Sequence, residues 1–158
     1  MTGEATGLPG VAIVLADEAA TAALGAALAG RLRAGDVVTL AGPLGAGKTS
    51  LVRGTLAALG LRGEAPSPSF ALVQPYAPPD TTLPVMHVDL YRLRAPEEIE
   101  ELGLDDALDD GVLLIEWPER AGADPWPEAL ALSLAVDAEG VRRLTAAVPA
   151  PWKDRWPI

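Results

Sequence analysis

Residues 39–50, TLAGPLGAGKTS, constrain the fold of this 158-residue chain more than any other stretch. Gly42, Gly47, Lys48 and Thr49 have the spacing of a phosphate-binding loop. Glycines let backbone N–H groups converge on phosphate oxygens, and a helix that follows adds the partial positive charge of its N-terminus. Lys48 would then reach the β- and γ-phosphates of a nucleotide, and the Thr49 hydroxyl would ligate Mg²⁺.

The sequence on either side of the loop supports this interpretation. Residues 36–42, DVVTLAG, are predicted to form a strand that runs straight into the loop. Residues 48–59 have helical composition, with Leu51, Thr55 and Leu59 one turn apart on one face. The loop thus lies between a strand and a helix, where a phosphate loop belongs. We therefore expect nucleotide binding rather than a glycine-rich turn that matches the pattern by accident.

The other stretches predict a mixed α/β domain. Strands are expected at 11–16, 69–76, 85–90, 111–116, 129–136 and 141–148, and further helices at 17–35 and 96–103. Strands and helices alternate early in the chain, and antiparallel pairs follow later. This order predicts one three-layer α/β domain over 1–148, a P-loop NTPase fold with a mixed parallel and antiparallel sheet. Residues 149–158 are expected to be a loosely attached tail.

The composition indicates a folded domain and removes several kinds of site. Hydrophobic residues make up 49% of the chain and charged residues 22%, which favours a globular protein over a disordered one. The absence of cysteine excludes disulfides, thiolate metal sites and a cysteine nucleophile. No apolar run is long enough to span a membrane, and the N-terminal stretch lacks the features of a secretion signal. We therefore expect a cytoplasmic protein with no membrane association.

The net charge argues against tight direct binding of nucleic acid. Twelve basic residues stand against 22 acidic ones, which gives a formal charge of −10. A protein that grips nucleic acid needs a basic face to displace counterions from the phosphates, and this sequence has no basic run. If nucleic acid takes part in the function, we expect a partner protein to hold it.

Two carboxylates follow apolar strands where a second nucleotide-binding motif should lie. Asp89 stands in VMHVDLYR, where His87, Asp89 and Tyr91 alternate onto one face. Glu116 ends the apolar run VLLIE. One of these acids could hold Mg²⁺ and the other could orient the attacking water. The spacing leaves open which acid does which.

Two other residues near these acids have more than one interpretation. His87 is the only histidine, and a hydrogen-bonded structural role is favoured over a role as general base. Trp117 could stack on a nucleobase or close the core.

The acidic segment 96–110 is predicted to be a solvated helical face, although it could also dock onto a basic partner.

Four segments in this order, GPLGAGKT, SPSF, HVDLYRL and LIEWPER, resemble the bacterial TsaE (YjeE) family, over about residues 15–148. The resemblance implies a small P-loop ATPase of tRNA threonylcarbamoyladenosine (t6A, position 37) biosynthesis that binds ATP and Mg²⁺. Such a protein would hydrolyse ATP weakly alone and act with the TsaB–TsaD pair, in which TsaD modifies the tRNA. Hydrolysis would reset that complex between turnovers, and tRNA would be contacted only through the complex.

The resemblance also implies roles for individual residues. Thr49 and Glu116 correspond to the Mg²⁺ ligands, and Asp89 and Lys48 to the residues needed for hydrolysis. The implied nucleotide-binding residues are Gly42, Pro43, Leu44, Gly45, Ala46, Gly47, Lys48, Thr49, Ser50, Ser69, Trp117 and Arg142.

The sequence departs from the family pattern at three places. Pro43 replaces an aspartate, which removes an acid and one backbone N–H from the loop. Ser69 and Phe70 replace a Thr-Tyr pair, which keeps the hydroxyl and loses the phenol. Val141 stands where the family often has arginine, which leaves open whether Arg142 or Arg143 approaches the nucleotide.

Two other functions compete with the ATPase interpretation. A small P-loop kinase would transfer the γ-phosphate to a nucleotide or metabolite, but such kinases usually carry an arginine-rich lid, and the basic residues here are scattered. A regulatory nucleotide switch would act through binding alone. The pair of Asp89 and Glu116 favours at least slow hydrolysis over such a switch.

Overall fold

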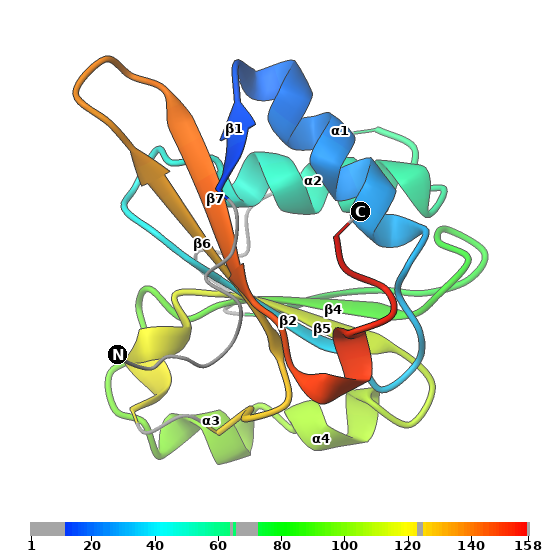
Figure 1. Cartoon of the computed structure of the whole chain (residues 1–158). Coiled ribbons are helices and arrows are strands. Elements are labelled where there is room, and N and C mark those ends of the chain that lie inside the picture. The colour runs from blue at the N-terminus through cyan, green and yellow to red at the C-terminus, as the bar shows by residue number, and fades with distance from the viewer. Residues whose placement is uncertain (1–11, 64, 66–72, 123–124, 158) are drawn as a thin grey trace.

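The computed structural model describes residues 12–63, 65, 73–122 and 125–157. The described strands form one seven-stranded sheet in the order β1-β7-β6-β2-β5-β4-β3 (Figure 1). Their bounds are β1 Ile13–Leu15, β2 Val37–Ala41, β3 Val73–Tyr76, β4 Val85–Asp89, β5 Val112–Glu116, β6 Leu130–Val136 and β7 Arg142–Ala147. Strands β6, β2, β5 and β4 run parallel, whereas β1, β7 and β3 pair antiparallel with their neighbours. The predicted mixed sheet is confirmed.

Helices cover both faces of this sheet (Figure 1). The helices are α1 Glu18–Ala29, α2 Lys48–Ala58, α3 Glu98–Glu101 and α4 Leu104–Ala107, with short 3₁₀ turns η1 Pro118–Ala121 and η2 Ala150–Trp152. One core cluster joins α1 and α2 to the sheet, and a second joins the α3–α4 region to the opposite face. Because side chains alternate along a strand, Val85 and His87 of β4 face α2 while Val88 faces the second cluster.

Helices α1 and α2 meet backbone to backbone. A Cβ atom at Gly25 would lie 2.1 Å from the carbonyl oxygen of Leu51, and one at Gly54 would lie 2.2 Å from that of Ala22. The buried Thr55 hydroxyl donates to the carbonyl of Gly25 at 2.9 Å. Glycine is required at both crossing positions because any side chain would push the helices apart. Helix α2 carries the phosphate loop at its N-terminus, so α1 fixes the position of that loop.

The prediction that residues 149–158 are loosely attached is wrong for the described part of that segment. Trp152 is 1% exposed and belongs to the core between the sheet and α1 and α2. The Arg155 guanidinium donates to both carboxylate oxygens of Asp36, at 2.6 and 3.0 Å, and to the Arg31 carbonyl at 2.8 Å. Arg155 also lies over the Trp152 ring, 4.0 Å from its centroid. This segment therefore packs against the chain between α1 and β2 (Figure 1).

Candidate functional site

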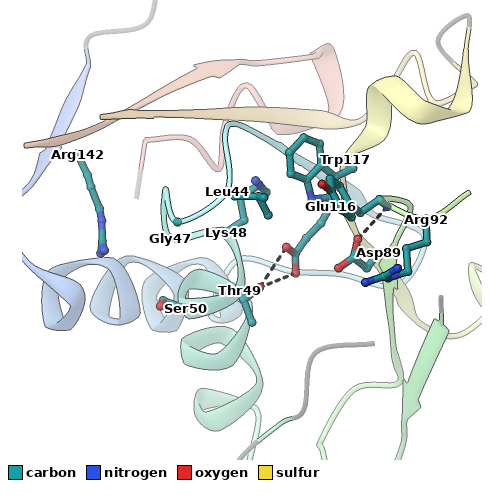
Figure 2. A pocket seen from close by; sticks show the side chains of 12 residues that line it. Leu44, Gly47, Lys48, Thr49, Ser50, Asp89, Arg92, Glu116, Trp117 and Arg142 are labelled. Atoms are coloured by element: carbon teal, nitrogen blue, oxygen red, sulfur yellow. Dashed lines mark hydrogen bonds between the residues drawn. The ribbon is translucent and has the colours of Figure 1, made fainter. Parts of the chain in front are cut away.

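A pocket of about 420 Å³ opens beside the N-terminus of α2, at the carboxyl ends of the parallel strands (Figure 2). This is the edge at which open α/β sheets bind ligands, because the loops that leave the strands meet there. The pocket is lined by Leu44, Gly45, Gly47, Lys48, Thr49, Ser50, Asp89, Tyr91, Arg92, Glu116, Trp117 and Arg142.

The phosphate loop joins β2 to α2 through two glycines that other residues could not replace. Gly42 has φ +144°, and a Cβ atom there would lie 2.5 Å from the Leu134 carbonyl oxygen. Gly47, at the N-cap of α2, has φ +107° in the left-handed region. No side chain among the described residues caps the helix, so its first N–H groups face the loop. The loop thus has the backbone form of an anion site.

The Lys48 side chain folds back onto the loop. Its Nζ atom donates to the carbonyl oxygens of Gly42 and Pro43, the latter at 3.0 Å. It also lies 4.0 Å from the centroid of the Trp117 ring. Burial lowers the pKa of Lys48, against the opposing effect of Glu116, Glu119 and Asp89. The loop carbonyls and the indole ring therefore hold a buried ammonium group next to the pocket.

The two predicted carboxylates lie side by side at the ends of neighbouring strands. Asp89 of β4 and Glu116 of β5 are Cα partners in the parallel ladder, and both are buried. The Thr49 hydroxyl lies 3.2 Å from each carboxylate oxygen of Glu116 (Figure 2). A threonine hydroxyl and a carboxylate in contact at the start of a phosphate-loop helix form a donor set that suits Mg²⁺.

Asp89 occupies a less polar environment than an ordinary surface carboxylate. Burial raises its pKa, and the charge of Glu116 raises it further. The backbone N–H of Tyr91, which donates to Asp89 Oδ1 at 2.9 Å, opposes this rise, as do His87 and Lys48. The result is a carboxylate of raised basicity that lines the pocket, which suits an acceptor for a proton of water.

His87 makes a contact that the sequence did not predict. Its Nε2 atom lies 2.7 Å from Glu116 Oε2, and both side chains are buried. The interpretation of His87 as a hydrogen-bonded residue is confirmed. Its partner could not be deduced, because nothing local in the sequence states that β4 lies next to β5.

Trp117 both packs and lines the pocket, so its two interpretations from the sequence are compatible. It packs against the second core cluster and contacts the Tyr91 ring, with centroids 4.8 Å apart. It is the only non-glycine residue with positive φ in the described chain, at +60°. Arg120 lies over the Tyr91 ring, 5.0 Å from its centroid.

Tyr91 and Arg92 also line the pocket, although they were not predicted as site residues from the sequence. They directly follow Asp89 in the HVDLYRL segment.

The structure separates the two candidate arginines. Arg142 lines the pocket, and its Nη1 atom is buried without a hydrogen-bond partner in the described part of the chain. A Cβ atom on Gly47 would lie 3.6 Å from that Nη1 atom. Arg143 instead points to the exposed side and pairs with Asp137 at 3.5 Å. Arg142 is therefore the arginine that lies over the phosphate loop.

Some predicted site residues do not line the pocket. Ala46 is buried in the core, and the carbonyls of Gly42 and Pro43 hold Lys48. Ser69 lies outside the described residues. Within the described ranges, no group of three or more His, Asp or Glu side chains could hold a metal alone. A cation bound here would need phosphate oxygens and water as further ligands, which is how Mg²⁺ is usually held.

Asp137 is expected to hold the turn that delivers Arg142 to the pocket. Its Oδ1 atom accepts from the N–H groups of Val141 and Glu139, both at 2.9 Å, and the Val141 contact is the main reason that its pKa is lowered. Replacing Asp137 by alanine should speed amide exchange at Val141 about five- to tenfold, the effect of one lost hydrogen bond.

The same turn should respond to pH in the parent protein. Because the folded pKa is below the unfolded value of about 3.9, the turn is stabilised above that value and loses this stability as the pH falls through the folded pKa. Exchange at Val141 in the parent should then approach that of the Asp137→Ala variant. Equal exchange in the two proteins at neutral pH would contradict this role for Asp137.

Comparisons with known proteins agree on one family. The family model for "Threonylcarbamoyl adenosine biosynthesis protein TsaE" matches residues 15–144. A tRNA threonylcarbamoyladenosine biosynthesis protein TsaE from Treponema pallidum is 37% identical over 128 residues, which cover 80% of this chain and 93% of the relative. The relative of the same name from Streptomyces coelicolor is 47% identical over 97 residues, 61% of this chain. That match spans 66% of the relative's own length, just under two thirds.

A solved structure extends the likeness to the fold. The crystal structure of Bacillus subtilis YdiB superposes with a TM-score of 0.77 at 26% sequence identity. The superposition covers 95% of this chain and 93% of the other. The described helices include none with the length and apolar character that a membrane span requires.

Proposed function

The chain belongs to the TsaE family of threonylcarbamoyl adenosine biosynthesis proteins, and we propose that it binds and hydrolyses ATP in the formation of t6A in tRNA. One observation carries this proposal. The Thr49 hydroxyl lies 3.2 Å from both oxygens of a buried Glu116, at the end of a glycine loop that also presents Lys48. Loop, lysine, hydroxyl and carboxylate are the parts that a P-loop ATPase requires.

The pocket residues fit a nucleotide with Mg²⁺. The loop over 42–49 and Ser50 would hold the phosphates. Arg142 Nη1, which has no hydrogen-bond partner among the residues that the structure describes, has the charge and position to meet an anion. We propose Ser69 and Trp117 as further nucleotide-binding residues. Thr49 and Glu116 would hold Mg²⁺, which when bound would neutralise charge on the phosphate oxygens.

The chain's own residues then have distinct roles. Lys48 would exchange the carbonyls of Gly42 and Pro43 for phosphate oxygens, which are stronger acceptors for an ammonium group. Asp89 would orient the attacking water, because it is buried beside Glu116 and its raised pKa makes it a better proton acceptor than an ordinary aspartate.

The family and the net charge support a proposal about the partners. We propose that the chain acts with the TsaB and TsaD proteins in the cytoplasm, and that tRNA is held by those partners. The formal charge of −10 supports this division, since tight binding of tRNA phosphates needs a basic face and the sequence has no basic run.

Phosphate release from Mg-ATP by the purified chain tests the proposal. Release should be slow for the chain alone and should rise when the TsaB–TsaD pair and tRNA are added. Replacing Lys48 by alanine should weaken ATP binding by about 100-fold or more, because charge-assisted hydrogen bonds contribute roughly 1.5–3 kcal/mol each. The control is a panel of phosphoryl acceptors: phosphate appearing on an acceptor, with no response to the pair, would show a kinase instead.

A further inference from the structure

The His87 ring makes one polar contact in the described part of the chain, and that contact is with the carboxylate that we assign to Mg²⁺. The Nε2 atom lies 2.7 Å from Glu116 Oε2. The Nδ1 atom is buried without a hydrogen-bond partner in the described ranges. An ionised carboxylate can only accept, so a hydrogen bond from this ring to an ionised Glu116 requires the ring proton on Nε2.

The contact distinguishes the two oxygens of Glu116. The one hydroxyl proton of Thr49 is shared between the two oxygens, each 3.2 Å from Thr49 Oγ1. Oε2 also has His87 Nε2 at 2.7 Å, whereas Thr49 is the only donor near Oε1 among the described side chains. A carboxylate held at one oxygen by a buried donor keeps its other oxygen in a fixed direction. That oxygen is then the one with lone pairs left for a cation or its water.

The strand register explains how the His87 ring can reach the Glu116 carboxylate. His87 is the Cα partner of Leu114, two residues before Glu116 on the same face of the neighbouring parallel strand. A ring at this position can reach along the strand to the end of the Glu116 side chain. An apolar residue would fill the same space without holding the carboxylate.

We propose that His87 is a positioning residue, which orients Glu116 for Mg²⁺ through its Nε2–H group. The inference rests on the proposed nucleotide site and adds to it a residue that acts through Glu116 rather than on the nucleotide. Outer hydrogen-bond partners of metal ligands typically change metal affinity by about 10- to 100-fold when they are removed.

Two amide substitutions at His87 give a matched test. His87→Gln can place an N–H donor near the position of Nε2, whereas the shorter His87→Asn places its amide near the position of Nδ1. Both bring a polar amide into the same buried site, so a general cost of burial affects both. Thr81→Val serves as a control for stability, because it removes a buried 2.8 Å hydrogen bond to Leu83 in a turn away from the pocket.

The readout is binding of AMPPNP, a non-hydrolysable ATP analogue, measured by calorimetry in EDTA and over a Mg²⁺ series. All variants should bind AMPPNP in EDTA within about twofold of the parent. His87→Asn should raise, by about 10- to 100-fold, the Mg²⁺ concentration at which half of the Mg²⁺-dependent change in AMPPNP affinity is reached. His87→Gln should stay within about threefold, and Thr81→Val should lower the melting temperature without changing the Mg²⁺ series.

Each outcome bears on a different claim. If AMPPNP binding by His87→Asn depends on Mg²⁺ as it does in the parent, the positioning role is overturned and the proposed function is left intact. An equal shift in both His87 variants would also overturn it, because position of the donor would then not matter. A parent that binds no AMPPNP, or binds it without response to Mg²⁺, would overturn the proposed function and the inference with it.

A measurement on the unaltered chain decides the matter if His87→Asn does not fold. His87 is the only histidine, so its ring N–H resonance can be assigned without ambiguity by NMR. Addition of Mg²⁺ to the AMPPNP complex should shift that resonance, because the carboxylate that accepts the proton gains a cation. An unshifted resonance would overturn the proposal.

Discussion

Replacing Asp89 by asparagine is expected to lower ATP turnover by about 10²- to 10⁴-fold, the usual contribution of a positioned acid or base. Binding of AMPPNP should stay within about threefold of the parent. Asparagine keeps the shape of the side chain and can still accept from the Tyr91 N–H, so the strand end is preserved. What is lost is the negative charge beside Glu116, which we propose orients the attacking water.

Stability provides a second check on this variant. The folded pKa of Asp89 is raised, mainly by burial, so its stabilising effect is complete below the unfolded pKa and is lost as the pH rises through the folded value. Above that value the ionised group is a cost to the fold, so Asp89→Asn should melt no lower than the parent there. Asp105→Asn, an exposed carboxylate on α4, is the control and should leave turnover unchanged. If Asp89→Asn hydrolyses ATP as fast as the parent, Asp89 does not orient the attacking water.

Replacing Gly54 by alanine is expected to destabilise the protein by about 3 kcal/mol or more, at or beyond the upper end for overpacked cores. The new methyl carbon would lie 2.2 Å from the Ala22 carbonyl oxygen and 2.8 Å from two other backbone atoms of Ala22. Because these neighbours are backbone atoms, no rotation of a side chain can relieve the clash. For a chain of this size, such a loss lowers the melting temperature by roughly 6–12 °C.

The sign of the Gly54 effect is diagnostic, because glycine to alanine in a helix is ordinarily stabilising by roughly 0.5–1 kcal/mol. Gly30→Ala is the matched control at the end of α1. Gly30 has φ −70°, and the nearest heavy atom to an added Cβ is 3.6 Å away. That variant should melt at or above the temperature of the parent. A Gly54→Ala protein that also melts at or above the parent would show that α1 and α2 are not in backbone contact.

The sequence predicts those parts of the site that short-range rules govern. The phosphate loop is recognisable because Gly42, Gly47, Lys48 and Thr49 lie within one short stretch between a strand and a helix. Asp89 and Glu116 are recognisable because each ends an apolar strand. Parallel pairing explains why both side chains lie at the same edge of the sheet. That they are direct neighbours depends on β4 lying next to β5, which the sequence did not predict.

The alternation of buried and exposed residues along β7 distinguishes Arg142 from Arg143. Leu144 and Ala146 of β7 are buried, and Arg142 lies two residues before Leu144 on the same face. Arg143 falls on the opposite, exposed face. The period of two in VRRLTAAV therefore selects Arg142, although the loop over which it lies cannot be deduced from β7 alone.

Contacts between distant segments could not be predicted. His87 meets Glu116 only because β4 lies next to β5, and strand order is a property of the whole sheet. Asp36 and Arg155 are 119 residues apart, and nothing near either of them indicates the other. The Pro-rich composition of residues 149–158 suggested a loose end. Composition does not indicate whether a tryptophan such as Trp152 is buried in the core.

The packing of residues 150–155 has a consequence for how the chain is made on the ribosome. Strand β1 pairs with β7 in the sheet. The first described strand therefore cannot pair until the last one has been synthesised. Trp152 then completes the core, and Arg155 neutralises an Asp36 that was synthesised long before. The nascent chain therefore cannot complete this core until Trp152 has left the ribosome. The phosphate loop emerges well before the sheet that supports it is complete.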